Sequence, residues 1–144
     1  MIPRETAAAI IGCLEGALVH LLKAGVVVDY ADTEDPIRVQ MGELWLPTAT
    51  TAGLLAAINS AHPDLAGPDV AFRDPSVKTD VRRLSETDMR RIRVGLSEAL
   101  QLLGQVTAIL RAAESIEIVE KERLVSRSME STRAISAMLE RLAE

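Results

Sequence analysis

Few of the side chains that do chemistry in proteins occur in this chain at a spacing that would let them act together. The histidines are His20 and His62, and Cys13 is the single cysteine. A zinc site takes three or four such ligands, so these residues predict no metal centre. Cys13 lies in an apolar run with helical spacing, which is typical of a buried structural thiol.

The densest group of oxygen ligands is formed by Asp29, Asp32, Glu34 and Asp35. A calcium-binding EF-hand loop needs a glycine at its sixth position and a glutamate at its twelfth, and neither is present here. The cluster is therefore interpreted as a solvated turn. The glycines lack the Lys-Ser/Thr pair of a phosphate-binding loop, and no serine lies in a nucleophile elbow. These patterns predict no enzyme and no cofactor.

A basic segment over residues 78–93 is the strongest chemical signal. It holds Lys78, Arg82, Arg83, Arg90, Arg91 and Arg93. Arginines at the start of a helix contact phosphates well, and such contacts carry most nonspecific affinity for nucleic acid. The alternative is a solvated face that forms ion pairs with the acidic first half. Residues 1–77 have a net charge of −6 (4 basic, 10 acidic), and residues 78–113 have +3 (7 basic, 4 acidic), which favours the alternative.

The elements that must position these side chains are helices in the second half of the chain. From Ser85 onward there is no proline, and Ser85 with Asp88 resembles a capping box that starts a helix. Apolar residues then recur at steps of three and four, as in an amphipathic helix. The stripe comprises Met89, Ile92, Leu96, Ala99, Leu103, Val106, Leu110, Ala113, Leu124, Val125, Thr132, Ile135, Leu139 and Leu142.

This region allows two interpretations. The preserved phase of the stripe favours one continuous helix, about 85 Å long at 1.5 Å per residue. Ser115, as a second N-cap, favours a helical hairpin instead. A chain of 144 residues does not cover a continuous helix of that length. An interface with a protein partner or a second copy is therefore predicted at Leu96, Leu103, Leu110, Ile135, Leu139 and Leu142.

The first half of the chain has the pattern of a small α/β unit. Residues 3–24 read as a helix that Gly25 ends. Short β-branched or alternating runs at 26–28, 37–41 and 44–46 predict strands, with Gly42-Glu43 as a hairpin turn. Residues 48–61 read as a second helix, capped by Thr50 or Thr51. The predicted fold is mainly α, with a helix–β-hairpin–helix unit over 1–61, a loop or linker over 62–84 and a helical arm or hairpin over 85–144.

The start of the chain and the length of its apolar runs bear on where the protein acts. The start of the chain lacks the pattern of a signal peptide, and no apolar run reaches the length of about 18 residues that a membrane span needs. The expectation is a cytoplasmic, non-enzymatic assembly or adaptor protein, a homo-oligomer or a binder of a protein partner through its C-terminal helices, as in phage-type structural subunits. The alternative is a small nucleic-acid-binding oligomer, of packaging or regulatory type, that uses Arg82, Arg83, Arg90, Arg91 and Arg93. A third hypothesis is a module that docks its acidic half onto a basic partner.

Overall fold

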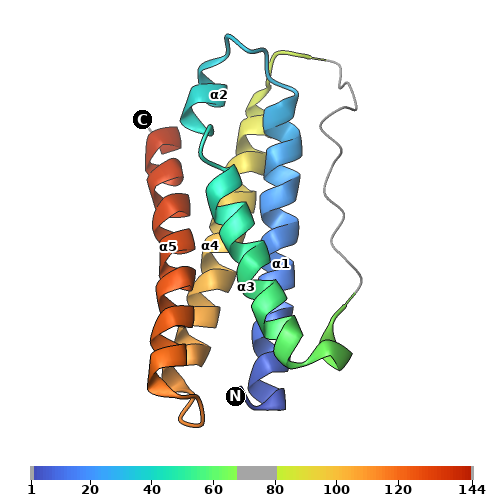
Figure 1. Cartoon of the computed structure of the whole chain (residues 1–144). Coiled ribbons are helices and arrows are strands. Elements are labelled where there is room, and N and C mark those ends of the chain that lie inside the picture. The colour runs from blue at the N-terminus through green and yellow to red at the C-terminus, as the bar shows by residue number, and fades with distance from the viewer. Residues whose placement is uncertain (1, 68–80, 144) are drawn as a thin grey trace.

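The structure is a computed structural model, and it describes residues 2–67 and 81–143. Within these residues, four long helices lie side by side (Figure 1). They are α1 (Arg4–Asp29), α3 (Trp45–Ala61), α4 (Glu86–Ala112) and α5 (Ile118–Ala143). A short helix, α2 (Pro36–Gln40), lies between α1 and α3, and a 3₁₀ turn, η1 (Pro63–Leu65), follows α3. Helices α1 and α5 run in one direction, and α3 and α4 run in the other (Figure 1).

The helices form a four-helix bundle in which every neighbouring pair is antiparallel. Helix α1 packs against α3 and α4, and α5 packs against the same two helices. Each helix contributes buried residues at alternating steps of three and four, the spacing that keeps one apolar seam toward the bundle axis. In α1 this seam is Ala7, Ile10, Leu14, Ala17, Leu21, Ala24 and Val28, and in α4 it is Ile92, Leu96, Ala99, Leu103, Val106 and Leu110.

The seam of α5 contains two buried serines. Its members are Leu124, Ser128, Ser131, Ile135, Met138 and Leu142. The Ser128 hydroxyl lies 2.8 Å from the Thr107 hydroxyl of α4, and both donate to the Leu103 carbonyl oxygen, at 3.2 and 3.1 Å. The Ser128 and Thr107 hydroxyls therefore link α5 to α4 across the buried seam, whereas the buried Ser131 hydroxyl has no partner among the described residues.

The mainly α prediction is confirmed, but the predicted β-hairpin is wrong, because the described residues contain no strand. Val26 to Val28 extend α1, where Val27 and Val28 are buried against the core. Strand propensity amounts to a fraction of a kcal/mol per residue, and burial of the bundle seam outweighs it. Gly25 consequently lies within the helix and does not end it.

The predicted strands at 37–41 and 44–46 are also helical or turn residues. Ile37 and Met41 are both buried and lie four residues apart, which is the spacing of a helical turn. Asp35 caps α2 by accepting a hydrogen bond from the Ile37 amide at 3.0 Å, and Pro36 occupies the first turn. Gly42-Glu43 is a turn between two helices.

Helix α3 begins at Trp45, three residues before the predicted start. Pro47 fits its first turn because amide groups there need no acceptor within the helix. Leu44 is the N-cap residue, so neither Thr50 nor Thr51 caps the helix. Thr51 lies inside α3 and is buried.

The start of α4 agrees with the prediction from the sequence, but the helix does not continue to the end of the chain as the continuous-helix interpretation expected. Ser85 and Asp88 form the predicted capping box. The chain then leaves the helix at Ala113, whose backbone is extended, and α5 begins at Ile118. The buried side chain of Ile116 fixes the loop against the core. Residues 85–144 therefore contain a helical hairpin, and the continuous helix is wrong.

Candidate functional site

A pocket of about 700 Å³ opens at the end of the bundle that carries α2. We call it the end pocket. Three elements build it: the second half of α1, the segment from α2 to Leu44, and the first turns of α3. Its walls are mainly apolar and include Leu21, Leu22, Val26, Met41, Leu44, Trp45, Ala49 and Ala52. This volume and lining are typical of sites that take a small molecule or large apolar side chains of a partner.

The polar side chains of the end pocket are Asp29, Arg38 and Thr48. Arg38 donates from Nε to the Ala31 carbonyl at 2.9 Å and from Nη2 to the Asp29 carbonyl at 3.1 Å. These bonds satisfy carbonyl groups at and just after the end of α1, for which the helix itself supplies no amide donor. The Thr48 hydroxyl donates to the Leu44 carbonyl at 2.8 Å. Asp29 is exposed, and its carboxylate bonds to no other described residue.

Trp45 stands at the pocket with two thirds of its surface in solvent. Its exposed fraction is 67%, and that of Val39 on α2 is 82%. Trp45 is the only tryptophan of the chain. Large aromatic side chains are normally buried or used in contacts with partners, where tryptophan is strongly enriched. An exposed tryptophan beside an apolar pocket therefore makes this end of the bundle the candidate binding surface.

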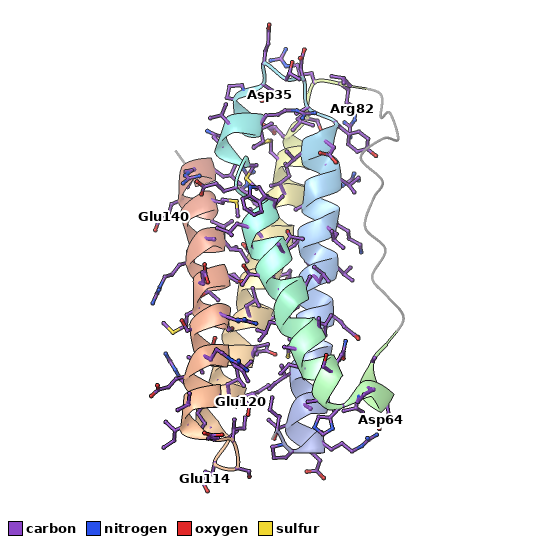
Figure 2. The ribbon with its side chains drawn as sticks, viewed as in Figure 1. Asp35, Asp64, Arg82, Glu114, Glu120 and Glu140 are labelled. Atoms are coloured by element: carbon purple, nitrogen blue, oxygen red, sulfur yellow. The ribbon has the colours of Figure 1, made fainter. Side chains whose placement is uncertain are left out.

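The acidic cluster lies at the same end. Asp32 accepts a hydrogen bond from the Glu34 amide at 3.4 Å, and Asp35 caps α2. Figure 2 shows Asp35 and Arg82 at this end of the bundle, with Glu114 at the opposite end. The interpretation as a solvated turn agrees with this arrangement, since Asp32 and Glu34 are exposed. In the described residues, no group of three His, Cys, Asp or Glu side chains is placed to hold a metal ion.

The basic segment divides into one structural arginine and several exposed ones. Arg82 binds Asp88 through two hydrogen bonds, and its guanidinium lies 4.8 Å from the centre of the Tyr30 ring. These bonds, with those from Ser85, hold the pKa of Asp88 at about 2, and the carboxylate in turn raises the pKa of Arg82. Two nitrogens of the Arg82 guanidinium are thus bound to Asp88, while 45% of the side chain stays exposed. Lys78 lies outside the described residues.

Arg83, Arg90, Arg91 and Arg93 are exposed. None forms an ion pair within the part of the chain that the structure describes. The predicted pairing of the basic segment with the acidic first half is therefore not the arrangement of these four side chains. Arg83 lies beside Asp32, Glu34 and Asp35 in a shallow depression of about 390 Å³, without reaching ion-pair distance.

The predicted interface residues lie inside the chain's own bundle. Five of them, Leu96, Leu103, Leu110, Ile135 and Leu142, are buried, and Leu139 is half-buried against the core. In this arrangement they are occupied by contacts between α4, α5 and the N-terminal helices. A homo-oligomer stays a prediction, but the stripe no longer gives a reason for it.

The two histidines and the single cysteine lie in contacts with neighbouring parts of the bundle or partly buried on a helix. The His62 ring nitrogen lies 2.6 Å from the Ile2 carbonyl oxygen. The Cys13 thiol is half-buried at 3.5 Å from the Gln105 side-chain oxygen, and burial raises its pKa. His20 is half-buried on α1. The end pocket was missed, because it needs three elements whose folding was predicted incorrectly. The single Trp45, next to a turn, was the signal that could have found it.

Helix α1 has the length and apolar composition of a membrane span, and no other described helix does. A core helix of a bundle passes the same test, and one face of α1 is buried against α3 and α4. Comparisons with family models, curated proteins and solved structures give no significant match. The geometry of the end pocket is therefore the feature that points to a function.

Proposed function

We propose that the chain is a non-enzymatic adaptor that holds an apolar segment of a protein partner in its end pocket. The observation that carries this proposal is the exposed Trp45 on the wall of an apolar pocket of about 700 Å³. A partner segment that enters would cover the indole and the apolar wall. Burial of apolar surface contributes roughly 25 cal/mol per Å², so a few large side chains suffice for a specific contact.

The polar groups of the pocket favour binding over catalysis. Arg38 and Thr48 are both bound to backbone carbonyl groups, so they hold α1, α2 and α3 in place. Asp29 is exposed, and its carboxylate has no hydrogen-bond partner among the described residues. The pocket therefore offers a preformed apolar surface with a fixed frame.

The proposal differs from the sequence hypothesis in the surface used. The sequence predicted that the C-terminal helices bind the partner, but the apolar residues of these helices are buried in the bundle core. The adaptor role is kept, and the contact surface moves to the α1, α2 and α3 end.

Trp45 supplies the test because its fluorescence reports only this pocket. The probe is a peptide of about 14 residues, or nearly four helical turns, with Leu at i, i+3, i+4 spacing and Gln elsewhere. We expect a saturable blue shift of the Trp45 emission. Ala49→Phe, which fills the pocket, should abolish it. Ala56→Phe is the matched control, since Ala56 is exposed on α3 one heptad further on and does not line the pocket. The proposal is overturned if the unmodified chain binds no amphipathic peptide, or if both variants bind equally.

One observation favours nucleic acid as a second candidate function. Arg83, Arg90, Arg91 and Arg93 are exposed without ion pairs in the described residues, and Arg90 and Arg93 lie one helical turn apart. Free arginines on one helix suit contacts with phosphates. The engagement of Arg82 with Asp88 reduces the predicted surface.

A further inference from the structure

A second hollow, of about 320 Å³, lies between α4 and α5 near the loop that joins them. We call it the hairpin groove. Helix α4 contributes Arg111, and α5 contributes the other lining residues, which are Lys121, Glu122, Val125, Ser126, Met129 and Arg133. The loop of this hairpin and the α2 end of the bundle lie at opposite ends of the molecule (Figure 1). The hairpin groove shares no lining residue with the end pocket and is separate from it.

The hairpin groove has a surplus of positive charge. Its charged side chains are three bases, Arg111, Lys121 and Arg133, and one acid, Glu122, which gives a net charge of +2. Composition does not explain this surplus, because residues 111–133 contain five bases and five acids. Three of the five bases line the groove, whereas four of the five acids do not. The fold therefore sorts bases onto this surface.

The three bases are not neutralised by the chain itself. None of them forms an ion pair within the described residues. The Arg111 guanidinium donates from Nη2 to the Met129 sulfur at 3.1 Å. A thioether is a weak acceptor, and a guanidinium carries five N–H donors. This bond therefore orients the Arg111 side chain and leaves most of its donors for an anion.

The bond to Met129 also brings two arginines together. Met129 and Arg133 lie one helical turn apart on α5, which separates their Cβ atoms by about 6 Å. Arg111, bound at Met129, is therefore held beside the position of Arg133. Like charges at this separation repel each other, and an anion between them removes the repulsion. Lys121 lies on the same ridge of α5, eight residues or about 12 Å before Met129, near the positive end of the helix dipole.

The uncharged lining indicates what kind of anion fits. Val125 and Met129 are half-buried and give the groove an apolar wall, and the exposed Ser126 offers a hydroxyl. A thioether packs well against an aromatic ring, and a guanidinium matches the geometry of a phosphate. The volume of about 320 Å³ is at the lower end of the range for small-molecule sites.

We infer that the hairpin groove binds a small organic phosphate, of which a nucleoside diphosphate is the type. Arg111, Arg133 and Lys121 hold the phosphate groups, and the ring packs on Val125 and Met129. This inference goes beyond the proposed function and does not depend on it, since it concerns another surface.

The methionine methyl groups supply the test, because Met129 lines the hairpin groove and Met41 lines the end pocket. The chain is labelled with ¹³C at its methionine methyl groups and titrated in NMR with ADP, pyrophosphate, adenosine and a short thymidine oligonucleotide. We expect ADP to shift the Met129 signal in a saturable way and to leave Met41 unchanged. ADP should bind at least about tenfold more tightly than adenosine, because adenosine lacks the charged groups. Pyrophosphate should bind more weakly than ADP, since it lacks the ring.

Charge variants locate the site. Arg111→Gln with Arg133→Gln should weaken ADP binding about tenfold or more. The control is Arg123→Gln with Arg127→Gln, which makes the same change in net charge at exposed positions of α5 outside the groove. The control should bind ADP as the unmodified chain does. Glu122→Gln removes the one acid of the lining and should tighten ADP binding several-fold, an effect that a misfolded chain cannot produce.

Several results would overturn the inference. ADP that leaves the Met129 signal unchanged, or adenosine that binds as tightly as ADP, would mean that the groove does not recognise phosphate. Equal losses in the two arginine pairs would show nonspecific attraction. An oligonucleotide that binds at Met129 more tightly than ADP would assign the groove to a nucleic-acid backbone and reject the small ligand. None of these results bears on the adaptor proposal, which fails only if amphipathic peptides leave Trp45 and Met41 unaffected.

Discussion

The guanidinium of Arg82 binds both carboxylate oxygens of Asp88, with distances of 2.5 and 2.8 Å. The same arginine reaches the end of α1, because its amide donates to the Tyr30 carbonyl at 2.8 Å and its side chain lies over the Tyr30 ring. Asp88 also accepts from the Ser85 amide at 2.8 Å as part of the α4 capping box. One arginine thus joins the start of α4 to the end of α1, on the end of the bundle that carries the pocket.

Because of this pair, the free energy of unfolding should fall as the solution becomes acidic. The pKa of Asp88 falls from 3.8 to about 2 in the folded chain, so its contribution is present above pH 4 and is lost as the pH falls toward 2. We expect Asp88→Asn to melt at a lower temperature than the unmodified chain at neutral pH. The difference should shrink between about pH 4 and about pH 2. Thermal melts followed by circular dichroism measure this. Glu86→Gln is the control, and a difference that stays constant with pH would contradict the account.

Two helical glycines should respond oppositely to alanine. A Cβ at Gly104 would meet nothing within 4 Å, whereas a Cβ at Gly95 would lie 3.2 Å from the His20 carbonyl oxygen of α1. We expect Gly104→Ala to raise the free energy of unfolding by about 0.5–1 kcal/mol, because alanine is the better helix former. Gly95→Ala should lower it, since backbone of α1 must move. Urea unfolding of both variants tests the close approach of α1 and α4, which a stabilised Gly95→Ala would rule out.

Leu103 tests the assignment of the apolar stripe to the bundle core. It is fully buried, so Leu103→Ala should cost about 2–5 kcal/mol of unfolding free energy. Leu103→Asp should prevent folding, because an unpaired charge would be buried. The exposed neighbour Gln101 gives a control in Gln101→Ala, which should change stability by less than about 0.5 kcal/mol. A folded Leu103→Asp chain with unchanged melting temperature would mean that the stripe faces solvent.

The nucleic-acid alternative makes a separate prediction about salt. If the exposed arginines bind phosphates, retention on generic DNA should weaken steeply between about 50 mM and about 200 mM salt. Arg90→Gln, Arg91→Gln and Arg93→Gln together should flatten that dependence without unfolding α4, since glutamine is a good helix former. Arg82→Gln should instead lower stability through Asp88. Absence of binding at low salt would remove this candidate.

The helical half of the fold was predictable where local signals and packing agree. The capping box of Ser85 and Asp88 set the start of α4, and its apolar stripe gave the buried face. In α5 the expected stripe included Thr132 and Leu139, whereas the buried seam contains Ser128 and Ser131. Hydropathy does not identify such positions, because Ser128 is buried through its hydrogen bonds with Thr107 and Leu103.

The first half was not predictable from local pattern. The valines after Gly25 favour strand, but their place in the α1 seam makes them helical. The alternation from Ile37 to Met41 is too short to separate a strand from one helical turn. The end pocket depends on both errors, since it is built from the extension of α1, from α2 and from the early start of α3. A sequence read as strands at these positions has no such pocket.

The most direct test of the adaptor account is an NMR titration of the ¹⁵N-labelled chain with the amphipathic Leu/Gln peptide. The account predicts shifts of the Trp45 indole N–H and of the Gly25 and Gly42 amides, which line the end pocket. The amides of Gly53 and Gly104, which are exposed elsewhere on α3 and α4, should not move. Shifts confined to α4 and α5, with the Trp45 signal unchanged at saturation, would contradict the account.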